Sequence, residues 1–243
     1  KKWIMIGVQA GGDASHLGLA ASIVAIAATD SGNGYWLASG DGGIFTFGDA
    51  AYHGSVAHLP LSEPIVGIAT NADETGYWVV ARDGGVFALG SAEFHGSAGA
   101  IQLNEPIVDL VESIDGAGYW LIASDGGVFS YGTVAFHGSL GSADLGDERI
   151  VGAAVAPGGG GYWMAGHLGS VFSFGNAEYH GGASAQPDEP IGAIAARPQG
   201  DGYWLATAPG TDWFGPPIPA QSGRGQRIVY SNSEQRLWLV EAD

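Results

Sequence analysis

The stretch that decides the fold is residues 65–97, which read IVGIATNADETGYWVVARDGGVFALGSAEFHGS. It contains four short apolar runs, at residues 65–69, 76–81, 86–90 and 92–97, separated by turns rich in Gly, Asp and Asn. Asp-Gly between apolar runs is a strong hairpin signal, and short runs of β-branched and aromatic residues favour strands. The stretch therefore predicts four short antiparallel strands.

The same pattern recurs along the chain. Gly-Tyr-Trp occurs at residues 34–36, 76–78, 118–120, 161–163 and 202–204, in steps of 42, 42, 43 and 41 residues. A second marker, aromatic-His-Gly, keeps the same register at residues 52–54, 94–96, 136–138 and 179–181. Four strands in a unit of about 42 residues are typical of a β-propeller blade. Adjacent Tyr and Trp point to opposite faces of a strand, so we expect the Trp series to be core between neighbouring blades.

We predict an all-β fold, a six-bladed β-propeller of four-stranded antiparallel blades, forming a single domain over residues 1–243. Five units follow one another at residues 23–64, 65–106, 107–149, 150–190 and 191–227. Residues 228–243 match only the first two strands of a unit, and residues 1–22 match the last two. We expect these two segments to form a composite sixth blade, because such closure removes free sheet edges.

Composition and charge limit the partners. The net charge of -17 repels phosphate backbones and anionic membranes, so we expect no nucleic-acid partner and no membrane insertion. The chain has no Cys, which excludes disulfides, thiolate zinc sites and cysteine nucleophiles. The apolar run at the start is too short for a signal peptide, and the first residue is Lys. We therefore expect a processed chain or an excised domain.

The repeat resembles the Gly-Tyr-Trp, Asp-Gly-Gly-[Ile/Val]-Phe, Phe-Gly, Phe-His-Gly-Ser repeats of exported proteins of actinobacteria, most clearly over residues 23–190. The resemblance implies an extracellular or cell-surface bacterial propeller, often one module of a larger protein. It implies no specific activity.

One histidine per unit is the first candidate site. In one interpretation these histidines line ligand pockets between blades, and in the other each forms a hydrogen bond to a neighbouring loop. The four are His53, His95, His137 and His180. We expect the aromatic residues that precede these histidines, Tyr52, Phe94, Phe136 and Tyr179, to be core. With one His per unit and no close pair at ligand spacing, we expect no metal and no cofactor.

Carboxylates form the second candidate site. Glu63, Glu105 and Glu189 precede the first strand of a unit, and Glu148 occupies the same place. A rim of such side chains holds a cation or meets a basic partner in one interpretation, and is simply solvated in the other.

The third candidate lies in the first strand of each unit. Its third position is Ala or Gly except at Asp109 and Tyr230, which belong to the third and sixth units. In a six-membered ring these units face each other, so the pair either forms a site at the central channel or fills space there.

An enzymatic function is poorly supported. Six-bladed sialidases need an arginine triad, but the first strands contain no arginine apart from the flanking Arg149 and Arg227. No Gly-x-Ser-x-Gly nucleophile elbow occurs in a strand-helix context. The sequence therefore favours a monomeric, non-catalytic extracellular recognition module for glycan or cell-envelope polymer. The alternatives are a scaffold or accessory domain that docks a basic protein surface and, more remotely, a sialidase-like glycosidase.

Overall fold

A computed structural model describes residues 18–183, 190–197, 201–207, 227–231 and 236–240 of the chain, without the side chains of the last two ranges. Within these ranges every regular element is a β-strand. The described residues thus contain no helix that could span a membrane. The predicted all-β class is confirmed.

Each of the first four repeats forms a three-stranded antiparallel sheet in sequence order. The strands of the first two repeats are β1 (Ile23–Ala28), β2 (Tyr35–Ser39), β3 (Ile44–Phe47), β4 (Ile65–Thr70), β5 (Gly76–Ala81) and β6 (Val86–Gly90). Those of the next two are β7 (Ile107–Glu112), β8 (Gly118–Ala123), β9 (Val128–Gly132), β10 (Ile150–Val155), β11 (Gly161–Gly166) and β12 (Val171–Gly175). The fifth repeat contributes the pair β13 (Ile191–Ala196) and β14 (Tyr203–Thr207).

The fourth strand predicted for each unit is wrong for the first four repeats. Residues 51–55, 92–97 and 134–140 have no strand assignment, and neither have residues 177–183. Side chains hold these segments in place of a strand ladder, as described below. One backbone bond returns each segment to a glycine in the turn between the second and third strands of its own repeat, for example from Ala98 N–H to Gly84 O at 2.8 Å.

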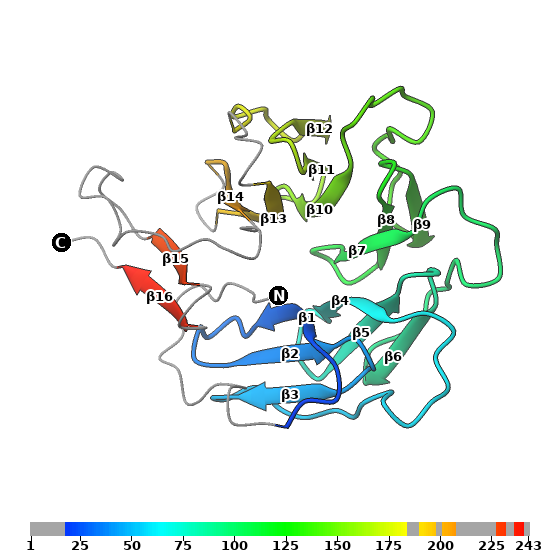
Figure 1. The fold of residues 1–243 in the computed structure, drawn as a ribbon, viewed down its shortest axis with the longest axis vertical. Helices are drawn as coiled ribbons and strands as arrows, with labels where there is room; N and C mark the ends of the chain where they lie inside the picture. The colour runs from blue at the N-terminus through cyan, green and yellow to red at the C-terminus, as the bar shows by residue number, and fades with distance from the viewer. Residues whose placement is uncertain (1–17, 184–189, 198–200, 208–226, 232–235, 241–243) are drawn as a thin grey trace.

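Consecutive repeats are joined through their first strands. β1 lies against β4, β4 against β7, β7 against β10 and β10 against β13. These strands lie toward the middle of the molecule, and the third strands β3, β6, β9 and β12 lie at the outside (Figure 1). A backbone bond repeats at each junction, such as Ile107 N–H to Arg82 O at 3.0 Å. Each of these first strands also has a register shift just before its third residue.

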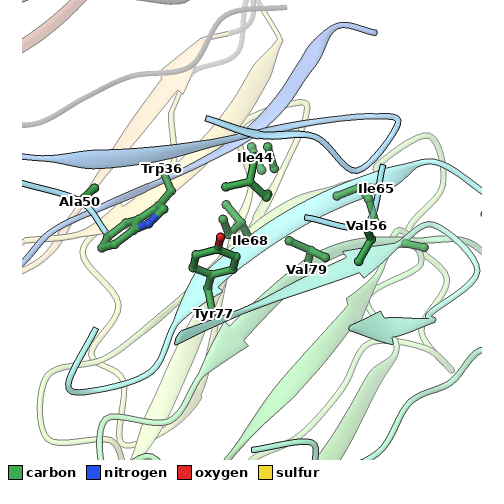
Figure 2. Close-up of a cluster of buried hydrophobic side chains, with 11 residues drawn as sticks. Trp36, Ile44, Ala50, Val56, Ile65, Ile68, Tyr77 and Val79 are labelled. Carbon is green, nitrogen blue, oxygen red and sulfur yellow. The ribbon is translucent and has the colours of Figure 1, made fainter. Parts of the chain in front are cut away.

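Apolar side chains fill the space between consecutive sheets. The Trp of one Gly-Tyr-Trp packs on the Tyr of the next, as in Trp36 and Tyr77, whose ring centroids are 6.2 Å apart (Figure 2). Every residue of the middle strands β5, β8 and β11 is buried. Four members of the predicted Trp core are at most 2% exposed, namely Trp36, Trp78, Trp120 and Trp163. Trp204 in β14 is only partly buried.

The predicted composite blade falls largely outside the described residues. Residues 1–17 are not among them, while β15 (Arg227–Ser231) and β16 (Arg236–Val240) pair with each other as a two-stranded antiparallel sheet. Closure of the repeats into a ring therefore stays a prediction.

Candidate functional site

The most site-like feature is one exposed aromatic side chain in each of the first four repeats. Tyr52, Phe94, Phe136 and Tyr179 are 56–60% exposed, which overturns the expectation that they are core. Large apolar side chains are normally the first to be buried. We call these four residues the platforms. Each stands at the same place of its repeat, in the segment that follows the third strand.

The indole of the same repeat holds the backbone just before each platform. Trp78 Nε1–H donates to the carbonyl oxygen of Glu93 at 2.8 Å, and Phe94 follows directly. The same bond occurs in the other three repeats, at 2.7 Å from Trp36 to Ala51, 3.0 Å from Trp120 to Ala135 and 2.7 Å from Trp163 to Glu178. The buried Trp thus satisfies its only polar group while positioning an exposed ring.

A tyrosine of the following repeat holds the backbone just after each platform. Tyr119 Oη–H donates to Gly96 O at 2.6 Å and accepts from His95 N–H at 3.2 Å. Tyr77 and Tyr203 make the same pair of bonds, and Tyr162 donates to Gly138 O at 2.6 Å. Burial raises the pKa of Tyr77 and Tyr162 to about 12, so these hydroxyls remain donors at physiological pH.

The same junction requires a glycine in two of the aromatic-His-Gly markers, at Gly96 and Gly138. A Cβ on Gly96 would lie 2.5 Å from Cδ1 of Tyr131, and one on Gly138 would lie 2.5 Å from Cδ1 of Phe174. The φ angles of Gly96 and Gly138, 135° and 133°, are also ones that L side chains rarely adopt. In the second and third repeats the marker therefore records close packing against the third strand of the next repeat, whereas a Cβ on Gly181 would meet nothing within 4 Å.

The candidate histidines lie beside the anchors; His53, His95 and His137 are partly buried, whereas His180 is exposed. The ring of His95 lies 6.3 Å from Trp78 and 5.5 Å from Tyr119. His137 and His180 lie in the same way between their own Trp and the next Tyr. Nε2 of His53 is bonded to Glu74 O at 3.0 Å. Nε2 of His95 and of His137 is buried and has no hydrogen-bond partner among the described residues.

This geometry shows what the sequence reasoning missed. Adjacent residues of an extended segment point to opposite sides. In the first three repeats the His side chain packs inward, so the aromatic side chain next to it faces outward; in the fourth repeat both Tyr179 and His180 are exposed. A signal was present in the sequence, since Trp and Tyr already occupy both faces of the middle strand and leave little room for a third large ring.

The candidate carboxylates do not share one environment. Glu63 and Glu105 are exposed, and Glu189 lies outside the described residues. Glu148, at the equivalent place, is buried and accepts a hydrogen bond from Leu168 N–H at 2.7 Å. Its Oε1 also lies 3.3 Å from Nδ1 of His167. The fourth repeat thus uses this carboxylate to hold its own β11–β12 turn.

Asp109 bridges two first strands. Its Oδ1 accepts from Leu110 N–H of β7 at 2.9 Å, and its Oδ2 accepts from Ala153 N–H of β10 at 3.0 Å. Burial raises the pKa of this carboxyl to about 7. Tyr230 lies in β15, but its side chain is not among those described, so the proposed pairing of Asp109 with Tyr230 stays a prediction.

Comparisons with known proteins assign no family to this arrangement. No protein-family model matches the chain, and no curated protein sequence matches it significantly. The described residues contain no group of three or more His, Asp or Glu side chains that could hold a metal ion.

Proposed function

We propose that the chain is a non-catalytic module that binds a neutral polysaccharide through its four platforms. One observation carries the proposal: Tyr52, Phe94, Phe136 and Tyr179 are exposed at equivalent places, with the backbone anchored on both sides of each. The face of an aromatic ring is negative and attracts the polarised C–H groups of a sugar ring. A site that recurs in four successive repeats suits a ligand that is itself a repeat.

Preorganisation supports binding rather than a structural role. A single ring that stacks on a sugar contributes little affinity, and that little is lost if the backbone must first be ordered. Here the ordering is done by buried Trp and Tyr side chains. The four rings are also separate, one in each repeat, whereas a protein interface needs a continuous area of several hundred Å² on each partner.

Charge selects among polysaccharides. The net charge of -17 disfavours uronic-acid, sulfated and phosphate-bearing polymers. In repeats two and four a glutamate, Glu93 or Glu178, directly precedes the platform and is exposed. Sugars with equatorial hydroxyls present C–H groups on both ring faces, so β-1,4-linked glucose and N-acetylglucosamine polymers fit best.

The wider setting is part of the same proposal. We propose that the repeats close into a six-bladed propeller, with residues 1–22 and 228–243 sharing one blade in a single domain. Closure would cover the free edges of the sheets at the two ends of the repeat series. The likeness to repeats of exported actinobacterial proteins supports an extracellular or cell-surface location.

Sedimentation with insoluble polysaccharide tests the function. The monomeric protein is mixed with chitin, with amorphous cellulose and with cross-linked polygalacturonate, and the unbound fraction is measured. We expect binding to chitin or cellulose that persists at 0.5 M salt, and none to polygalacturonate. A variant with all four platforms changed to Ala is expected to lose the binding at least tenfold while keeping its melting temperature, because exposed side chains contribute little to stability.

A matched control removes exposed apolar side chains elsewhere. Leu59, Ile101, Ile114 and Leu168 are 39–55% exposed and lie outside the platform segments. Changing these four to Ala should leave binding intact. Equal loss in both quadruple variants, or no binding of the wild type to either neutral polymer, would overturn the proposal.

A second candidate function is docking of a basic protein on the exposed Glu63 and Glu105. Salt distinguishes it, because exposed charges are screened within about 10 Å at 0.1 M salt. A partner that dissociates between 0.05 and 0.5 M salt, and from a Glu63→Gln/Glu105→Gln variant, would favour docking over polysaccharide binding.

A further inference from the structure

We infer that the chain cross-links separate polysaccharide chains instead of binding one chain along its length. The inference rests on the proposed function and adds that different platforms bind different polymer chains. It follows from where the four platforms lie relative to the common centre of the repeats.

The repeats diverge from their first strands outward. Contacts between the strands of consecutive repeats run mainly through the first strands, such as β4 with β7, and from a middle strand to the next first strand, such as β5 with β7. At the outside, it is the platform segment that contacts the third strand of the next repeat, as Gly96 does with Tyr131. The third strands β3, β6, β9 and β12 lie at the outside of this arrangement, on different sides of it (Figure 1). Each platform segment directly follows one of these third strands.

Each platform is oriented by its own junction. Its two anchors are the Trp of its own repeat and the Tyr of the next. The direction in which a platform faces therefore changes with the orientation of the junction that holds it. β-1,4-linked glucans and chitin are stiff and extended. A stiff chain that lies on one outward-facing ring runs past the molecule and does not bend around to the next ring. Neighbouring platforms therefore take different chains, or distant parts of a polymer network.

A protein whose weak sites bind different polymer chains cross-links those chains only within a range of protein concentration. The second contact with a network is intramolecular and gains effective concentration without any new type of contact. Below saturation each protein joins two or more chains. In excess protein every chain is covered separately, and cross-links are lost. Cross-linking must therefore pass through a maximum as the protein concentration rises.

The experiment measures aggregation of beads by turbidity. Latex beads that carry covalently attached chitohexaose, and others that carry cellohexaose, are titrated with monomeric protein, and bead-bound protein is measured in parallel. We expect turbidity to rise and then fall with protein concentration on the beads that bind. Free hexasaccharide should disperse the aggregates. Light scattering of the protein alone must show a monomer throughout, because a dimer would also join beads.

Platform variants separate cross-linking from binding. The variant Tyr52→Ala/Phe94→Ala/Phe136→Ala keeps only Tyr179, and should bind beads at least tenfold more weakly without aggregating them at any concentration. The variant Phe94→Ala/Tyr179→Ala keeps Tyr52 and Phe136 in repeats one and three, and should still aggregate them. All the substitutions replace exposed platforms, so these variants are expected to fold.

The outcomes distinguish this inference from the proposed function. If no bead binds the wild type, the proposed function fails. If beads bind the wild type but never aggregate, the function stands and cross-linking is wrong. Aggregation by the variant that keeps only Tyr179 would also contradict the inference, since one platform joins nothing.

Discussion

The tyrosine anchor between repeats can be tested by the substitution Tyr119→Phe, which removes only the hydroxyl group. The hydroxyl of Tyr119 donates to Gly96 O at 2.6 Å and accepts from His95 N–H at 3.2 Å. The phenylalanine ring fills the same buried space, so packing against Trp78 is kept. The substitution removes two hydrogen bonds and leaves an amide and a carbonyl without their partner. At about 1 kcal/mol for each bond, the free energy of unfolding should fall by about 2 kcal/mol.

The matched control is Tyr131→Phe. Tyr131 lies in β9, across the strand pair from Tyr119, and the fourth repeat has Phe174 at the equivalent place. Its hydroxyl makes no hydrogen bond within the part of the chain that the structure describes. We expect a change below about 0.5 kcal/mol, as for other substitutions away from buried networks.

Two measurements read out the difference. Denaturant unfolding should show the loss of about 2 kcal/mol only for Tyr119→Phe, equivalent to a melting temperature lower by about 4–8 °C. Amide hydrogen exchange by NMR should show faster exchange of the His95 N–H in Tyr119→Phe, and unchanged exchange in the control. The reasoning is refuted if the His95 amide exchanges equally in the two variants, or if their stabilities agree within 0.5 kcal/mol.

Three further substitutions address packing, the glycine marker and the bridging carboxylate. Trp78→Ala should lower the free energy of unfolding by about 3–5 kcal/mol, because the side chain is fully buried between repeats; calorimetry that shows less than 1 kcal/mol would contradict its place in the core. Gly138→Ala should lower the free energy of unfolding by about 2–3 kcal/mol, because its Cβ would meet Phe174. Gly116 has a φ of 69° but lies in open space, so Gly116→Ala should lower it by about 1 kcal/mol. Urea titration of the two variants should show the larger loss for Gly138→Ala. Asp109 has a pKa raised to about 7 by burial, against 3.8 in an unfolded chain, so its ionised form is disfavoured in the folded state. Between pH 3.8 and about 7 the folded protein therefore binds more protons than the unfolded chain. As the pH falls from 8 to 5, the free energy of unfolding of the wild type should rise by about 2 kcal/mol relative to that of Asp109→Asn. Denaturant unfolding at each pH measures this gain, the exposed Glu93→Gln serves as control, and parallel pH profiles of Asp109→Asn and wild type would contradict it.

Much of the fold follows from local pattern. The Gly-Tyr-Trp spacing placed β2, β5, β8, β11 and β14, and the flanking apolar runs placed their partners. These predictions succeed because short turns that contain Asp or Gly join the strand pairs. They also succeed because the middle strands have apolar residues on both faces, which indicates burial on both sides. The fourth strand failed for a related reason. The segment around Phe94 has strand-like composition, but its backbone groups are bonded to Trp78, Tyr119 and a turn.

The sequence by itself determined the repeat, the strand class and the buried Trp and Tyr positions, because periodicity and alternation are properties of neighbouring residues. Only the tertiary structure decided that the four platforms face solvent and that Asp109 joins β7 to β10. Both depend on groups more than twenty residues away in the chain: the Tyr of the following repeat, and the Ala153 amide. Such contacts are set by how one sheet packs on the next. Residue spacing within a single repeat does not specify that packing.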